Sequence, residues 1–271
     1  MSGDEQTSVA FDRAAEYYDA TRGLPEEGVR LQTALLMEEL ASATPVLEVG
    51  VGTGQVALPL HEAGIQVVGL DLARPMMDKL VEKSGGGLPF PLVQADATRM
   101  PFPDGVFGSA YLRWVLHLIP AWETAVEEMV RVVRHEGVIC GLLGAYGGVR
   151  GEIQDRFSEM TGIDHAPVGL GWNATGELDR VMAGLGRRYR PLAPIRSTGS
   201  ETVEDFMQGI EGNRYSWTWR LPDDVRMKAA KDLRPWARER FGDLDVPVPY
   251  EFATEWRAYD TQDPRSPVNA A

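Results

Sequence analysis

The sequence is poor in the residues that form disulfides and metal sites. It has 1 cysteine and 4 histidines among 271 residues. The lone cysteine, Cys140, rules out an intrachain disulfide, and its apolar surroundings in "GVICGLL" predict a small buried side chain. The histidines are scattered and show neither CxxC nor HExxH spacing. We therefore expect no metal site.

Positive charge is also scarce. The chain has 27 Lys and Arg residues against 40 Asp and Glu residues, which gives a formal net charge of -13. Proteins that bind a phosphate backbone normally present a stripe of Lys and Arg that releases counterions. We therefore expect no nucleic acid among the partners.

Long apolar runs are missing as well. No run approaches the roughly 18 residues that a membrane span requires. The N-terminal stretch "MSGDEQTSVAFDRAAEYYD" is acidic and polar where a signal peptide would be apolar. The sequence therefore predicts a cytoplasmic protein without a membrane span, and it leaves open whether the chain forms a homodimer.

Between residues 46 and 145, short apolar runs alternate with longer periodic or turn-rich stretches. This alternation is typical of βαβ units and a parallel sheet. Helices are expected within 55–64 and 73–87, each closed by glycine. The predicted strands are "VLEVG", "QVVGLDL", "PLVQAD", "VFGSAYL" and "GVICGLL".

The flanking segments are predicted to be mainly helical. Residues 11–40 show helical periodicity in two pieces separated at "RGLP", and they should pack on the sheet. After residue 145 the alternation fades. There we expect helices within 148–162, 175–186, 202–215 and 225–242, one strand over 189–200, a final strand over 250–260, and a frayed tail.

The segment "VLEVGVGTGQ" places three glycines, Gly50, Gly52 and Gly54, directly after a predicted strand. Glycine suits a backbone that turns sharply, takes positive φ or approaches a ligand, and ligands of α/β sheets bind beyond the carboxyl ends of the strands. A tight turn without a ligand is the structural alternative. A dinucleotide fingerprint would need glycine at Gln55, and a phosphate loop would need Lys and Ser or Thr after the last glycine. Neither phosphate-binding pattern fits.

The pattern acid-x-G-x-G-x-G, which begins at Glu48, resembles that of the class I S-adenosylmethionine-dependent methyltransferases. The resemblance covers residues 10–145 and, loosely, the final strand. It implies a Rossmann-like three-layer α/β sandwich, with a seven-stranded, mostly parallel sheet, an antiparallel last strand and a helical cap. The implied domains are 1–148 for the N-terminal helices and core, 149–247 for a mainly helical substrate cap with one core helix and strand, and 248–271 for the last core strand and tail.

The resemblance also implies a set of cofactor-binding residues at successive strand ends. Asp71, followed by Leu72, corresponds to the ribose-binding acid, and Asp96 with Ala97 corresponds to the pair that contacts adenine. A carboxylate that accepts from both ribose hydroxyls makes strong, charge-assisted hydrogen bonds. The structural alternatives are that Asp71 caps the following helix and that Asp96 starts a turn.

Further contacts are implied near the N-terminus and after the fourth strand. The segment of Tyr18 and Arg22 resembles one that closes over the cofactor, where a tyrosine could stand over the sulfonium and the arginine could reach the methionine carboxylate. Arg113 and Trp114 are placed beside the adenosine or methionine moiety. A packing role on an amphipathic helix is the alternative for the pair Tyr17 and Tyr18.

The resemblance implies an enzyme that transfers a methyl group from S-adenosylmethionine to an O, N or C nucleophile of a small molecule. If the acceptor must lose a proton, His117 is the candidate base, because a side chain with a pKa near 7 serves best. The aromatic residues of 213–220 could line a planar-acceptor pocket or belong to the core. The competing functions are a non-catalytic S-adenosylmethionine-binding module and an NAD-dependent oxidoreductase, which Gln55 disfavours.

Overall fold

The computed structural model describes residues 8, 11–144, 148–163 and 166–261, and the expected tail lies outside these residues. The chain divides into two compact units. Unit 1 contains residues 1–144, 168–195 and 253–271, and unit 2 contains residues 145–167 and 196–252. Among the described residues, no helix has the length and the apolar character needed to cross a membrane.

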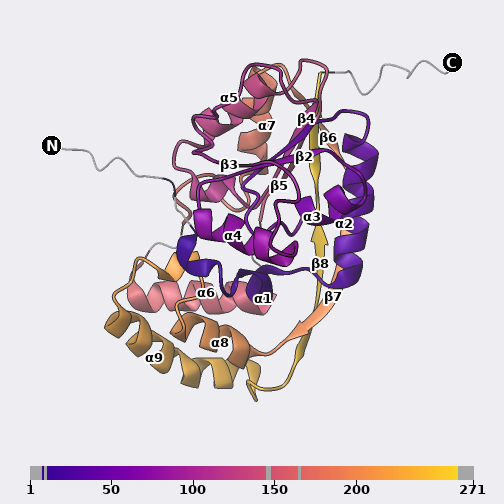
Figure 1. The fold of residues 1–271 in the computed structure, drawn as a ribbon. Helices are drawn as coiled ribbons and strands as arrows, with labels where there is room; N and C mark the ends of the chain where they lie inside the picture. Colours follow the sequence, from indigo (N-terminus) through magenta and orange to yellow (C-terminus); the bar gives the residue numbers. More distant parts are fainter. Residues whose placement is uncertain (1–7, 9–10, 145–147, 164–165, 262–271) are drawn as a thin grey trace. The chain divides into compact units, whose positions relative to one another are not determined.

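Unit 1 is built on a seven-stranded sheet with the order β3-β2-β1-β4-β5-β9-β6 (Figure 1). The strands from β3 to β5 in this order pair in parallel, whereas β9 is antiparallel to both β5 and β6. The predicted fold class is therefore confirmed. The strands are β1 (Val46–Val49), β2 (Val67–Asp71), β3 (Leu92–Gln94), β4 (Ser109–Arg113), β5 (Ile139–Leu142), β6 (Arg188–Pro191) and β9 (Arg257–Asp260).

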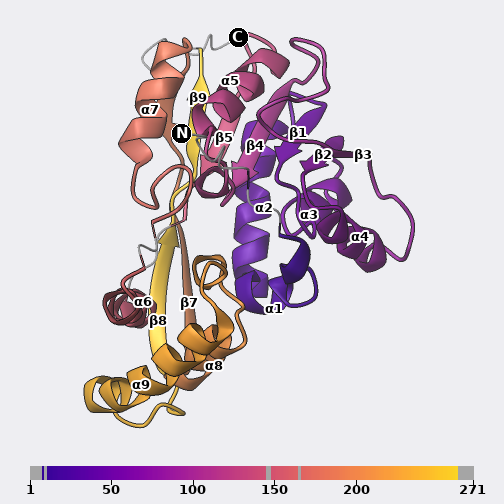
Figure 2. The ribbon, with the colours of Figure 1, turned by 90° about the vertical axis from the view of Figure 1, so that its left-hand side faces the viewer.

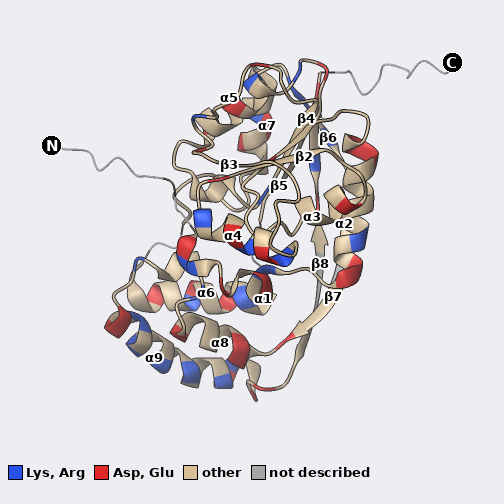
Figure 3. Cartoon of the chain, viewed as in Figure 1, with Lys and Arg blue, Asp and Glu red and all other residues tan. Residues whose placement is uncertain are grey.

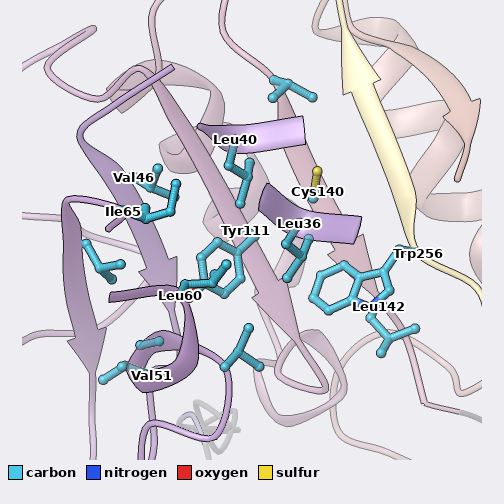
Figure 4. Packing of buried hydrophobic residues seen from close by; sticks show 14 of the residues in the cluster. Leu36, Leu40, Val46, Val51, Leu60, Ile65, Tyr111, Cys140, Leu142 and Trp256 are labelled. Atoms are coloured by element: carbon cyan, nitrogen blue, oxygen red, sulfur yellow. The ribbon is translucent and has the colours of Figure 1, made fainter. Parts of the chain in front are cut away.

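Helices cover both faces of this sheet because the strands bury apolar side chains on both sides. On one face, Leu36 and Leu40 pack against Tyr111 and Trp256 (Figure 4). On the other face, Met129 and Met182 belong to a second buried cluster. The helices of unit 1 are α1 (Tyr18–Arg22), α2 (Glu26–Leu40), α3 (Ala57–Glu62), α4 (Arg74–Lys83), α5 (Trp122–Val132) and α7 (Thr175–Gly184).

Two strands that were predicted to be continuous are each divided in the structure, so these predictions are wrong. The segment 189–200 forms β6 and then β7 (Ile195–Glu201), and the segment 250–260 forms β8 (Val248–Thr254) and then β9. β7 and β8 pair with each other in a separate two-stranded sheet. In the first case, the chain leaves the large sheet at Pro191 and Pro194, which have no backbone N–H to donate to a strand ladder.

Unit 2 contains α6 (Gly148–Thr161), α8 (Val203–Glu211) and α9 (Asp223–Phe241) together with β7 and β8 (Figure 2). Its helices share a buried apolar cluster that includes Phe157 and Leu233. Thr202 caps α8 by accepting a hydrogen bond from the backbone N–H of Asp205 at 2.9 Å. Charged residues of both signs lie along α9 (Figure 3), and its Arg234 donates to Glu204 of α8 at 2.6 Å.

Candidate functional site

The glycine loop after β1 depends on backbone conformations that other residues adopt poorly. Gly50, Gly52 and Gly54 have φ angles of 77°, 52° and 77°. A Cβ at Gly50 would lie 2.8 Å from Val115, and a Cβ at Gly54 would lie 2.8 Å from Leu80. Two of the three glycines are therefore also required by the packing of neighbouring side chains.

Gly52 differs from the other two glycines. A Cβ at Gly52 would find its nearest neighbour, the terminal methyl of Met76, at 3.4 Å. A methyl group at this middle glycine, at the carboxyl end of β1, would thus make ordinary van der Waals contacts and would not collide with a neighbouring side chain. In an α/β sheet this is the edge at which ligands bind.

Asp71, at the end of β2, holds the glycine loop and the start of α4 together. One carboxylate oxygen accepts from the backbone N–H of Gly52 at 2.7 Å, and the other accepts from that of Ala73 at 2.8 Å. Burial raises the pKa of Asp71, and these backbone hydrogen bonds oppose the rise. Each carboxylate oxygen has a second lone pair. Holding the backbone here is therefore compatible with accepting hydrogen bonds from a ligand.

The neighbouring Leu72 and the pair at the end of β3 have local structural partners. The carbonyl of Leu72 accepts from Gln94 at 3.1 Å. Asp96 accepts from both the backbone N–H and the hydroxyl of Thr98, at 2.9 and 2.8 Å, so it does start a turn. Ala97 is buried in the apolar cluster that also contains Leu70. Because β3 pairs with β2, Asp96 and Asp71 follow adjacent strands.

Glu48 lies within β1 and faces Tyr111 on β4, its partner in the strand register. Its side chain is 3% exposed, and the Tyr111 hydroxyl donates to it at 2.8 Å. Burial raises the pKa of Glu48 to about 8, although the hydrogen bond from Tyr111 and the charge of Arg113 act in the opposite direction. At neutral pH the carboxyl group is therefore mostly protonated.

An interaction network that the sequence did not reveal fastens α1 to the glycine loop. Asp19 of α1 accepts hydrogen bonds from Thr53 at 2.5 Å, Gln55 at 2.9 Å and Lys83 at 2.8 Å. Burial alone would raise the pKa of Asp19, but these three hydrogen bonds outweigh burial and lower it. The available signal was the polar pair, Thr53 and Gln55, at the glycine motif. Gln55 was considered only as a departure from the dinucleotide fingerprint.

Arg113 continues this network from the end of β4. It donates to Gln55 at 2.8 Å and to the backbone carbonyl of Arg22 at 3.4 Å. Its guanidinium carbon lies 3.8 Å from the centre of the Trp114 ring. Burial lowers the pKa of Arg113, and its electrostatic interaction with Tyr18 opposes this. The structure therefore links Arg113 to Tyr18, Arg22 and Trp114. Their contact with a cofactor stays a prediction.

The Arg113 side chain also borders a cavity of about 280 Å³, which is lined mainly by residues of α2, α3 and the α1–α2 connection. The Nε of Arg113, a residue only 8% exposed, has no hydrogen-bond partner among the described residues. The same holds for the amide oxygen of Gln32, which lines the same cavity. Buried polar groups are normally paired, so these two atoms are exceptions among the residues that line the cavity.

His117 lies in a short 3-10 helix (Leu116–Leu118) after β4. Its ring is 4.1 Å from that of Trp172, measured between centroids. Burial lowers the pKa of His117 to about 3, and the positive charge of Arg22 adds to this effect. The structure thus differs from the expectation of a pKa near 7, and the imidazole is neutral at physiological pH. Trp172, which had no motif to mark it, is a neighbour that the sequence did not reveal.

The aromatic residues of 213–220 contribute to the core of unit 2. Tyr215 and Trp217 are buried there and stack with their ring centroids 5.8 Å apart. Of the two roles considered for this segment, the structure supports core packing for these two residues. Within the described parts of the chain, no three His, Cys, Asp or Glu side chains come together as a metal site would require.

Comparison with known proteins agrees with this arrangement of loop and strand ends. The family described as "Methyltransferase domain" matches residues 47–141. The phosphatidylethanolamine N-methyltransferase of Cereibacter sphaeroides is 30% identical over 169 residues, which are 61% of this chain and 80% of that protein. The chain belongs to the class I S-adenosylmethionine-dependent methyltransferases.

Other similarities support the fold of this methyltransferase. The demethylmenaquinone methyltransferase of Renibacterium salmoninarum is 29% identical over 49% of this chain and 56% of its own length. The crystal structure of the YcgJ protein from Bacillus subtilis superimposes with a TM-score of 0.55 at 18% identity, covering 86% of this chain and all of that one. The chain therefore spans just over half of the first of these and the whole of the second.

The family match covers the predicted site of the methyltransferase unevenly. Residues 47–141 include the glycine loop, Asp71, Asp96 and His117. Tyr18, Arg22 and Trp172 lie outside that range, although their side chains interact with residues inside it. The family match therefore does not extend to these three residues.

Proposed function

We propose that this methyltransferase binds S-adenosylmethionine over the carboxyl ends of β1, β2 and β3 and transfers its methyl group to an O, N or C nucleophile of a small molecule. The observation that carries the proposal is that the glycine loop and the Asp71 carboxylate meet at the carboxyl ends of adjacent strands, where the N–H of Gly52 donates to Asp71 at 2.7 Å. Asp96 follows the next strand of the sheet, so the acids and the glycine loop share one edge.

The residues at this edge of the sheet fit the chemical groups of S-adenosylmethionine. Asp71 retains lone pairs for the ribose hydroxyls, and Asp96 follows the adjacent strand, where the adenine would lie. At the other end, Arg22 and Arg113 supply positive charge for the methionine carboxylate. Tyr18 interacts electrostatically with Arg113, which supports a role for Tyr18 at the same end.

When bound, the sulfonium supplies an already activated methyl group, so the protein contributes mainly by holding the acceptor in line with it. The chain's own groups suit this positioning role. Neutral His117 can accept a hydrogen bond from the acceptor's O–H or N–H. As a base it is weak, because burial and Arg22 disfavour its protonation. We therefore assign His117 to orienting the acceptor.

The proposal covers a broader class of acceptors than the one for which any single relative is named. The two relatives are named for phosphatidylethanolamine and demethylmenaquinone, which are chemically different acceptors. Shared methyl-donor chemistry with different acceptors supports a small-molecule methyltransferase. The comparison with these relatives assigns no particular substrate to this chain.

Titration calorimetry with S-adenosylmethionine, S-adenosylhomocysteine and NAD tests the proposal. We expect both sulfur compounds to bind and NAD to give no heat. Binding of NAD alone would establish an oxidoreductase instead. The release of S-adenosylhomocysteine across a panel of metabolites then tests transfer, and tight cofactor binding with no release from any class would favour a non-catalytic module.

A further inference from the structure

Trp172 is held over His117 by a backbone that is built for close contact. The N–H groups of Gly169 and Leu170 donate to the carbonyls of His117 and Leu116, both at 3.1 Å. A Cβ at Gly169 would overlap the carbonyl oxygens of Leu116 and Ile119, so that only glycine allows this approach. The loop before α7 is thereby fixed to the segment after β4, and Trp172 lies against the imidazole.

A second indole lies close to the same part of the chain. A Cβ at Gly144 would lie 3.3 Å from Trp114 and 3.6 Å from Trp172, so both indoles approach a position that carries no side chain. Trp114 has a φ of 53°, a left-handed conformation that is uncommon for a residue other than glycine. Such conformations are found most often at functional sites, where the surrounding structure maintains them.

Both indoles keep part of their surface outside the core. Trp114 and Trp172 are half-buried, in contrast to the fully buried Trp256 of the same unit. The guanidinium of Arg113 covers one side of Trp114, at 3.8 Å from the ring centre. Two half-buried indoles therefore lie near Gly144, which follows β5: Trp172 contacts the His117 ring, and Trp114 comes directly after β4.

We propose that Trp114 and Trp172 determine acceptor specificity by packing against a planar, unsaturated ring that carries the methylated group next to His117. The proposal rests on the proposed function and adds a substrate class to it. Aromatic rings pack against indole with a preference that saturated rings of similar size lack. The selected acceptor is neutral or anionic, because Arg22 and Arg113 both bring positive charge to this part of the unit.

Two probes that share a skeleton test the planar requirement. The binding of 2-naphthol and of decahydro-2-naphthol is measured by calorimetry in the presence of saturating S-adenosylhomocysteine. Simple hydrophobic transfer favours the saturated compound, which has the larger apolar surface. We expect 2-naphthol to bind roughly tenfold more tightly. A cationic planar probe, 2-naphthylmethylammonium, should bind more weakly than 2-naphthol.

Variants assign the preference to the indoles. In Trp172→Leu the preference for 2-naphthol should disappear, whereas Trp172→Phe, which keeps a planar ring, should retain most of it. Trp114→Leu and Trp114→Phe should repeat this pattern. Trp122→Leu, on α5 of the same unit, is the matched control and should leave the preference intact. A far-UV circular dichroism spectrum and a thermal unfolding midpoint close to those of the wild type show that a variant is folded.

The outcomes separate the two levels of the argument. The proposal that Trp114 and Trp172 select a planar ring is overturned if decahydro-2-naphthol binds to the wild type as tightly as 2-naphthol or more tightly. It is also overturned if both leucine variants keep the preference for 2-naphthol. If S-adenosylhomocysteine itself does not bind, the proposed function fails. In that case, the binding of 2-naphthol and decahydro-2-naphthol measured without S-adenosylhomocysteine still decides whether the indoles select planar ligands.

Discussion

The Asp19 carboxylate accepts a hydrogen bond from the side-chain amide of Gln55 at 2.9 Å and so joins α1 to the glycine loop. The other end of the same amide accepts from Arg113 at 2.8 Å. A single glutamine therefore connects three segments that are far apart in the sequence. This connection makes the N-terminal helix part of the candidate cofactor site.

Asp19→Ala should weaken S-adenosylmethionine binding by about tenfold, because α1 loses its attachment to the loop and the helix must be ordered again on binding. Calorimetry measures the change. Glu16→Ala is the matched control, because Glu16 pairs with Lys79 on the surface and its side chain is 79% exposed. The role of Asp19 is refuted if both variants bind with wild-type affinity.

Alanine at Gly54 and at Gly52 should have different consequences. Gly54→Ala strains a positive φ and collides with Leu80, so it should lower the free energy of unfolding by about 2 to 4 kcal/mol. Gly52→Ala has space for its methyl group and should cost about 1 to 2 kcal/mol from φ alone. Its larger effect should be on cofactor affinity. Chemical denaturation and calorimetry on the two variants distinguish these effects, and an unaffected affinity in Gly52→Ala would argue against a ligand there.

Asp71→Ala should weaken cofactor binding at least tenfold and also destabilise the fold, since the N–H groups of Gly52 and Ala73 lose their acceptors. Asp78→Ala, an exposed position on the adjacent helix, is the control for an acid removed nearby. Wild-type affinity in a destabilised Asp71→Ala would limit Asp71 to a structural role.

Glu48 should make stability depend on pH. The folded protein keeps its proton up to about pH 8, whereas in the unfolded chain the proton is lost near 4.5. The folded state therefore binds more protons between these values, and the free energy of unfolding contributed by Glu48 falls as pH rises, by at most about 1.4 kcal/mol per pH unit. Urea denaturation from pH 5 to pH 8 should show that Glu48→Gln lacks this fall. If the free energy of unfolding changed with pH by the same amount in the wild type and in Glu48→Gln, the raised pKa of Glu48 would be contradicted.

His117 should make the free energy of unfolding rise with pH, which is opposite to the effect of Glu48. Its folded pKa of about 3 lies below the ordinary value of 6.5, so its contribution to stability is lost as pH falls from about 6.5 towards 3. The proton NMR signal of the His117 ring should not titrate between pH 5 and pH 8. With the true acceptor, His117→Ala should slow turnover at unchanged S-adenosylmethionine affinity. Normal turnover would leave His117 as a packing partner of Trp172.

Local spacing predicted the elements that depend on near neighbours in the chain. Alternating apolar runs indicated the parallel strands. The acid-and-glycine pattern located the loop, because the strand and the glycines that follow it can be recognised within ten consecutive residues. The divided strands were missed, since apolar pattern cannot show which of two sheets a strand joins. In the same way, the spacing of the glycines did not separate Gly52 from Gly50 and Gly54, whose neighbours come from other segments.

The sequence by itself determined the family, the parallel core and the acids at the strand ends, because these follow from covalent order and short-range periodicity. Only the tertiary structure decided that Gln55 bridges Asp19 and Arg113, that burial keeps Glu48 protonated and His117 neutral, and that Trp172 lies against His117. Each of these depends on desolvation or on contact between residues distant in the chain. Desolvation and distant contacts exist only once the chain has folded.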